Sequence, residues 1–213
     1  MYDYLAHNVN DSVDKLKDVR FLFKTLFIEN VHNKTLPEWT KRVYPEKMRY
    51  PKDLGFTLQT WTHELKRLRA GPLISNIVET YQSLSSKLFT DDNDHDWDAK
   101  HRFHWERKMN MYSAHDSTLS NFLNSLGMFD PPIRPPYASC IMIELLKNVK
   151  SDGHFIRFYY HNETDVTFGN GTTKPHLLHM PGCDSTCPLE KFDELTKPLR
   201  PLDWERECRS KNI

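Results

Sequence analysis

Apolar residues recur at helical spacing in three stretches near the start of the chain. The segments 14–31, 54–69 and 70–89 each place leucine, isoleucine, valine or aromatic residues on one face. This period of about 3.6 residues predicts amphipathic helices. Pro72 is compatible with the third helix if it occupies the first helical position, where no N–H is needed. The N-terminal part is therefore expected to be helical.

The pattern changes after residue 107, where shorter apolar runs alternate with helical ones. The predicted elements are a short strand (108–114), a helix (117–127), two strands (138–147 and 154–162) and a final helix (187–199). The sequence NVKSDG between the two longer strands is typical of a hairpin connection. Gly127 is expected to end the helix before it. The second part is thus predicted to be α/β.

Length and charge narrow the class of protein. The 213 residues are enough for a domain with a real core. Lysine plus arginine and aspartate plus glutamate both number 29, so no overall charge directs the chain to nucleic acid or to an anionic membrane. No stretch has the length of a membrane span, and the first residues lack the basic and apolar regions of a secretory signal.

Two features nevertheless favour a secretory pathway. Glycosylation sequons occur at four positions: Asn10, Asn33, Asn162 and Asn170. Cys183 and Cys187 are spaced as in a small disulfide loop, with zinc as the rival interpretation if His176 and His179 supplied further ligands. The sequons and the cysteine pair favour secretion, whereas the first residues do not resemble a secretory signal. This conflict indicates that an N-terminal segment is lacking.

The charged segment 90–108 contains His101 and His104 among several aspartates. These residues are possible metal ligands, but their spacing matches no known metal site. Charged runs of this kind are mostly solvated surface. We expect neither a metal nor a cofactor.

His115 and Asp116 stand side by side where the predicted helix 117–127 begins. One interpretation makes Asp116 the helix N-cap and His115 a packed neighbour. The other places the pair at the carboxyl end of a strand, where helix N–H groups attract anions. His115 would then hold a phosphate, and Asp116 would protonate a departing alkoxide.

The sequence around His115 and Asp116 favours the second interpretation. The blocks YSAHDSTL, PPYASCIMIELL, FYYHNET, MPGCDSTCPLEKF and PLDWERECR follow one another in an order and spacing that resemble the histidine acid phosphatases, particularly the secreted and lysosomal acid phosphatases of animals. NKTLPEWTK and GPLISNI resemble segments of the same family's cap and return helix.

The resemblance implies the fold and the roles of the site residues. The fold would be the C-terminal part of a mixed α/β sheet flanked by helices, of the phosphoglycerate-mutase-like type. Residues 1–69 would form part of a helical cap, and residues 70–213 would belong to the phosphatase domain. Asp116 would be the proton donor, and His115 would contact the phosphate.

The family's nucleophile is a histidine in an Arg-His-Gly-x-Arg motif near the N-terminus. No Arg-His-Gly occurs in this sequence. Without the nucleophile there is no covalent step, and without the arginines the phosphoryl oxygens lack their main donors. We therefore expect the chain alone to be inactive, poorly stable and prone to aggregate.

Further expectations concern modification, partners and compartment. The resemblance implies that Cys183 pairs with Cys187, while Cys140 and Cys208 are free, paired with each other, or waiting for a partner in a missing segment. It implies phosphate monoesters as substrates, allows a homodimer, and implies a secreted or lysosomal glycoprotein.

The sequence is compatible with two functions. The first is an acid phosphatase represented by an incomplete chain. The second is a short secreted protein that has lost catalysis and acts as a phosphate-binding or interaction module.

Overall fold

The computed structural model describes residues 1–87, 108–129, 134–162 and 174–209. Its N-terminal part is helical and consists of α1 (Tyr2–Val9), α2 (Leu16–Val31), the 3-10 helix η1 (Glu38–Arg42) and α3 (Glu46–Thr57). These helices enclose one hydrophobic core, formed by Leu5, Val13, Val19, Phe23, Leu26, Val43 and Met48. The helix predicted at 14–31 is confirmed as α2, because its Val19, Phe23 and Leu26 face this core.

The helix predicted over 54–69 is wrong as a single element. The chain leaves α3 at Thr57 and continues as the 3-10 helix η2 (Leu58–Thr60) before α4 (His63–Lys87) begins. Trp61, expected on the buried face, is 64% exposed, whereas Thr60 is fully buried. The hydroxyl of Thr60 accepts a hydrogen bond from Asn124 Nδ2 at 2.6 Å. A buried polar contact thus replaces the apolar face at this bend.

Helix α4 is longer than expected because it continues through Pro72, which lies inside it. Proline lacks the N–H that would bond the carbonyl four residues earlier. The carbonyl of Leu68 instead accepts a hydrogen bond of 2.8 Å from Nε1 of Trp204. A side chain from the far end of the sequence therefore satisfies the backbone group that proline leaves unpaired.

The described sheet is antiparallel. Its strands are β1 (Cys140–Lys147), β2 (His154–His161), β3 (His176–Leu178) and β4 (Cys187–Pro188), in the order β1-β2-β3, with β4 also paired to β2. The predicted hairpin is confirmed, since Cys140 faces His161 and Lys147 faces His154 in the β1–β2 register.

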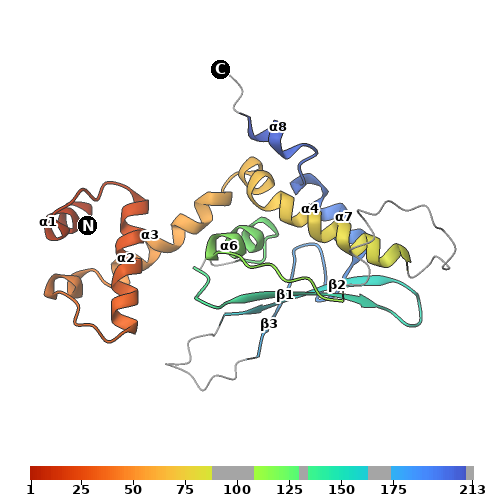
Figure 1. The fold of residues 1–213 in the computed structure, drawn as a ribbon, viewed down its shortest axis with the longest axis horizontal. Coiled ribbons are helices and arrows are strands. Elements are labelled where there is room, and N and C mark those ends of the chain that lie inside the picture. The colour runs from red at the N-terminus through yellow and green to blue at the C-terminus, as the bar shows by residue number, and fades with distance from the viewer. Residues whose placement is uncertain (88–107, 130–133, 163–173, 210–213) are drawn as a thin grey trace.

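A second hydrophobic core lies where helices cover this sheet. α4 and α6 (Asp116–Ser125) lie over one face of it (Figure 1). Ile156 and Phe158 of β2 are buried there together with residues of α4, α6 and α7 (Leu189–Thr196), namely Ile74, Val78, Phe122, Leu123 and Phe192. The mixed α/β architecture is as expected, and α6 ends near Gly127, whose φ of 69° is the left-handed conformation of a helix stop.

The strand predicted at 108–114 is absent. Residues 109–115 are not assigned to a strand, because no described strand pairs with this segment. The apolar side chains that suggested a strand are exposed, with Met109 at 72% and Met111 at 83%.

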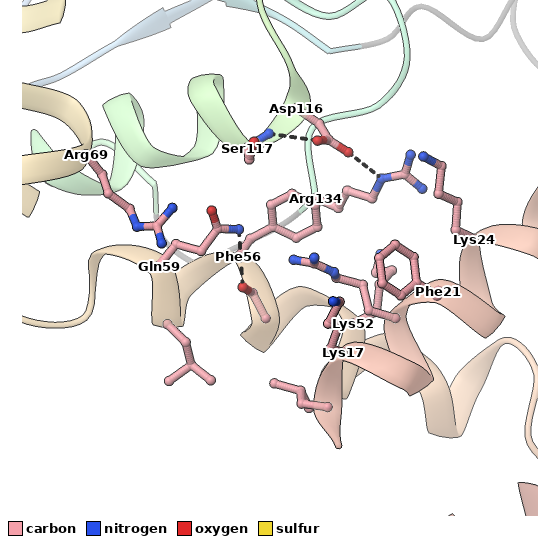
Figure 2. A pocket seen from close by; sticks show the side chains of 14 residues that line it. Lys17, Phe21, Lys24, Lys52, Phe56, Gln59, Arg69, Asp116, Ser117 and Arg134 are labelled. Carbon is pink, nitrogen blue, oxygen red and sulfur yellow. Dashed lines mark hydrogen bonds and ion pairs between the residues drawn. The ribbon is translucent and has the colours of Figure 1, made fainter. Parts of the chain in front are cut away.

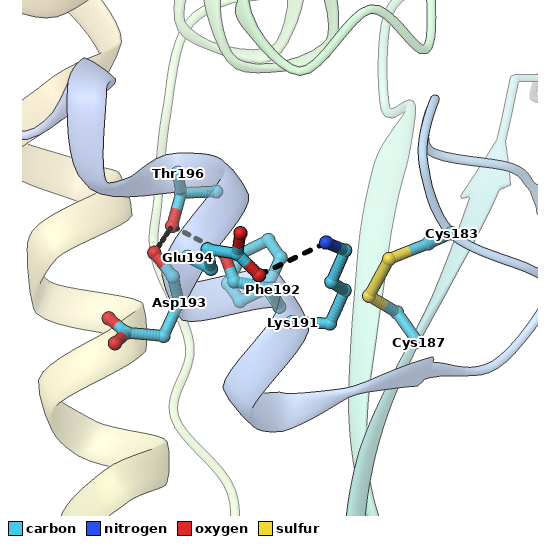
Figure 3. The surroundings of a disulfide bond; sticks show 7 residues. All are labelled: Cys183, Cys187, Lys191, Phe192, Asp193, Glu194 and Thr196. Carbon is cyan, nitrogen blue, oxygen red and sulfur yellow. Dashed lines mark hydrogen bonds and ion pairs between the residues drawn. A yellow bond between two sulfur atoms is a disulfide. The ribbon is translucent and has the colours of Figure 1, made fainter.

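The C-terminal segment returns to α4. After α7 come the 3-10 helix η3 (Lys197–Leu199) and α8 (Trp204–Cys208). Cys183 and Cys187 are joined by a disulfide just before α7 (Figure 3). Cys140 and Cys208 are exposed free thiols. Within the described residues, no helix has both the length and the apolar character needed to cross a bilayer.

Candidate active site

The His115–Asp116 pair lies where extended backbone becomes helix α6. His115 occupies the N-cap position with extended dihedral angles (φ −91°, ψ 162°) and makes no side-chain cap bond. Asp116 is the first helical residue, and its Oδ1 accepts the N–H of Ser117 at 2.8 Å. The interpretation of Asp116 as the N-cap is therefore wrong by one position, because a cap residue has non-helical backbone.

The second carboxylate oxygen of Asp116 faces an arginine that sequence analysis missed. Nε of Arg134 lies 3.3 Å from Asp116 Oδ2, and the arginine side chain is only 9% exposed. The backbone N–H of Arg134 donates to Asp53 Oδ1 at 3.0 Å. Its guanidinium lies 4.9 Å from the ring centroid of Tyr137. Arg134 is thus fixed at both ends, and nothing in its sequence neighbourhood distinguished it.

Asp116 lies between two cavities. The larger, of about 610 Å³, is lined by residues of α2, α3 and α4 together with Asp116, Ser117 and Arg134 (Figure 2). The smaller, of about 270 Å³, is lined by His115, Asp116, Lys24 and the segment 135–139. His115 is exposed and lines only the smaller cavity. A proton donor at this junction could serve a phosphate ester held in either space.

No group of three or more potential metal ligands occurs in the described part of the chain, and His101 and His104 lie outside it. The zinc interpretation required Cys183 and Cys187 as thiolate ligands beside His176 and His179. Both cysteines are joined in a disulfide, so neither can bind a metal as a thiolate.

The sequons differ in exposure. Asn10 and Asn33 are exposed, each with a positive φ at the end of a helix or turn. Asn162 is only partly exposed at the end of β2, and its Oδ1 is buried. Asn170 lies outside the described residues.

Comparison with known proteins identifies the family. Residues 6–161 match the model of the histidine phosphatase superfamily, branch 2. The chain belongs to this superfamily. It is 36% identical over 190 residues to prostatic acid phosphatase of Rattus norvegicus, a match that covers 88% of this chain and 43% of that protein. It is 30% identical over 213 residues to human lysosomal acid phosphatase, covering 97% and 44% respectively.

A solved structure with the same fold is the phytase from Citrobacter braakii. The TM-score is 0.63 at 17% identity, and the match covers 92% of this chain and 51% of the phytase chain. At this identity the likeness concerns the fold alone. The chain spans less than half the length of the curated relatives that it matches.

Proposed function

We propose that the chain contributes the His115–Asp116 half of an acid phosphatase site that hydrolyses phosphate monoesters. The observation that carries this proposal is the position of Asp116, which begins α6 and lines both cavities. The family supports phosphate monoester hydrolysis, and the prostatic and lysosomal acid phosphatases are relatives.

In this proposal Asp116 protonates the oxygen of the departing alcohol, and His115 contacts the phosphoryl group. A general acid contributes roughly 10²–10⁴-fold to the rate, which does not replace a nucleophile. The proposed nucleophile is a histidine that forms a phosphohistidine, followed by attack of water on that intermediate. The 213 residues contain no Arg-His-Gly, so we assign the nucleophile and its phosphate-binding arginines to a segment that is not in this sequence.

The compartment proposed is secretory or lysosomal, with glycans at the exposed Asn10 and Asn33 and the Cys183–Cys187 disulfide intact. The second candidate, a phosphatase-like protein without catalysis, is favoured by the absence of Arg-His-Gly from the sequence.

The test uses a chimera in which the N-terminal half of rat prostatic acid phosphatase precedes this chain. Asp116→Ala is expected to lower kcat by about 10²-fold or more for alkyl phosphates, whose leaving groups need a proton. The loss should be smaller for nitrophenyl phosphate, because nitrophenolate leaves without protonation. Equal losses for both substrates would remove the proton-donor role from Asp116.

His115 is tested in the same chimera through inhibition by vanadate. His115→Ala should weaken inhibition if the imidazole contacts the phosphoryl group. Unchanged inhibition would place His115 outside the site. A chimera that folds and shows no turnover at all would instead favour the non-catalytic alternative.

A further inference from the structure

The larger cavity beside Asp116 has a strongly unbalanced charge. Of the 14 residues that line it, Asp116 is the single anionic one, and six are cationic. We call these six residues the cationic cleft: Lys17, Arg20, Lys24, Lys52, Arg69 and Arg134. The whole chain carries equal numbers of basic and acidic residues, so this excess is a local feature and not a consequence of composition.

Two cations of the cleft are already paired. Lys52 lies 2.7 Å from Asp53, and Arg134 faces Asp116. The other four form no ion pair with a carboxylate of the described residues; they are Lys17, Arg20, Lys24 and Arg69. Four cations around one cavity that no described carboxylate neutralises produce a positive potential that attracts anions.

Aromatic rings hold part of the cleft in place without neutralising it. The guanidinium of Arg20 lies 5.4 Å from the ring centroid of Phe56 and 5.7 Å from that of Phe21. The ammonium of Lys17 lies 5.4 Å from the ring of Phe21. Cation–π contacts orient a cation over the ring face and leave its N–H groups free for an acceptor. The cleft is therefore organised in a form that can bind an anion.

We propose that the cationic cleft binds a second anionic group of the substrate, so that the preferred substrates are small phosphate monoesters whose leaving group carries another phosphate. This deepens the proposed function and rests on it, because the cleft adjoins the proposed proton donor. A volume of about 610 Å³ lies within the usual range of a small-molecule site. Charges from three helices meet there, Lys17 and Lys24 from α2, Lys52 from α3 and Arg69 from α4 (Figure 2).

The first experiment measures binding to the 213-residue chain and requires no turnover. The monomer is isolated by gel filtration and kept cold, because the chain alone is expected to aggregate on warming. The probes are glucose 1,6-bisphosphate and glucose 6-phosphate, which differ by one phosphate, and the method is isothermal titration calorimetry at low salt. We expect the bisphosphate to bind at least roughly tenfold more tightly, with the difference shrinking as salt screens the cleft.

The variant combines Lys17→Gln, Lys24→Gln and Arg69→Gln, three exposed positions whose substitution leaves both cores intact. A matched control removes the same net charge elsewhere through Lys34→Gln, Lys47→Gln and Lys150→Gln, all of them exposed and outside the cavity lining. The cleft variant should reduce the preference for the bisphosphate to about twofold or less, since the local cations supply it. The control should retain the preference.

Three results would overturn the proposal: equal binding of the two probes by the unmodified chain, no detectable binding of the bisphosphate, or an equal loss in both triple variants. The same triple variants in the chimera separate this proposal from the proposed function. A chimera that hydrolyses both esters without preferring the bisphosphate would leave the proposed function standing and remove the cleft's role. If the chain binds the bisphosphate but the chimera is inactive, the cleft keeps its role as an anion-binding site and the proposed function is removed.

Discussion

Pro72 shows at the scale of single residues how a long-range contact extends a helix. Pro72 was expected at the first position of a helix, but α4 continues through it, and Trp204 donates to the carbonyl of Leu68. The apolar period around Pro72 was visible in the sequence. The donor was not, because it lies in a different element far along the chain.

This contact predicts a specific coupling between Trp204 and Pro72. Trp204→Phe should lower the free energy of unfolding by about 1 kcal/mol, the net value of one hydrogen bond. Pro72→Ala restores an N–H that can bond Leu68, so the same Trp204→Phe change should cost less in that background. Urea unfolding of the four proteins measures the difference. Equal costs in both backgrounds would show that the indole stabilises α4 only by packing.

Gly71 allows the segment 199–201 to approach helix α4 closely. A Cβ built at Gly71 would lie 2.4 Å from the carbonyl oxygen of Leu199 and 2.6 Å from Cδ of Pro201, closer than real contacts allow. Gly71→Ala is therefore expected to lower the free energy of unfolding by about 1–3 kcal/mol, because the backbone must shift.

The matched control for Gly71 is Gly55→Ala inside α3, where the added Cβ would lie 3.4 Å from its nearest neighbour, Cδ of Arg20 in α2. Alanine is the better helix former, so this variant should be neutral or slightly stabilising in the same urea titration. A similar loss for both variants would mean that glycine is needed at neither position for close approach.

At the scale of elements, an ion pair joins helix α8 to α4, in addition to the hydrogen bond from Trp204 to Leu68. Arg67 donates to both carboxylate oxygens of Glu207, with Nη2 2.8 Å from Oε1. The hydrogen bond from Arg67 is the main cause that lowers the pKa of Glu207 from 4.5 to about 2. A lowered pKa in the folded state means that the contact stabilises the fold fully above the ordinary pKa, and that this contribution is lost as the pH falls through the folded-state value.

We therefore expect α8 to loosen from α4 between about pH 4.5 and pH 2. The indole N–H signal of Trp204, which reports the bond to Leu68, should shift in NMR spectra over that range. Glu207→Gln removes the titrating group, so its signal should already be shifted at neutral pH and should lack this step. An identical acid transition in Glu207→Gln would assign the change to other carboxylates.

The sequence predicted those elements whose burial follows their own period. α2 and α7 bury residues at intervals of three or four, and β2 buries every second residue. It failed at 54–69, where the buried residue is Thr60, held by Asn124 of another helix. It failed again at 108–114, because an extended apolar run becomes a strand only when another strand pairs with it.

At the scale of the whole molecule, the candidate site lies between two cores. α2 and α3 pack in the first core, and α4 and α6 pack in the second, yet side chains from all four line the larger cavity. The sequence indicated His115 and Asp116 because they are adjacent in a recognisable block. It did not indicate Arg134 or the cationic cleft, since those residues converge only when the two cores are brought together.

The last prediction concerns the 213-residue chain as a whole. Large apolar side chains are exposed before α6 and on β1, including Met109, Met111, Tyr112 and Met142. Exposed apolar surface of this kind favours association. We expect the chain alone to bind a hydrophobic dye such as ANS, to aggregate on warming, and to show no phosphatase turnover above background at acid pH.

Joining the chain to the N-terminal half of the rat relative should reduce dye binding and slow hydrogen exchange around residues 108–115, since the added sheet would cover this surface. Turnover should appear in the same protein, with a phosphohistidine that is trapped by quenching in alkaline denaturant, because its P–N bond is labile in acid. A chain that alone is monomeric, binds no dye and hydrolyses a monoester, with the activity abolished by Asp116→Asn, would show that it contains its own nucleophile. Dye binding that persists in an active chimera would instead assign the apolar surface to a partner and not to the added N-terminal half.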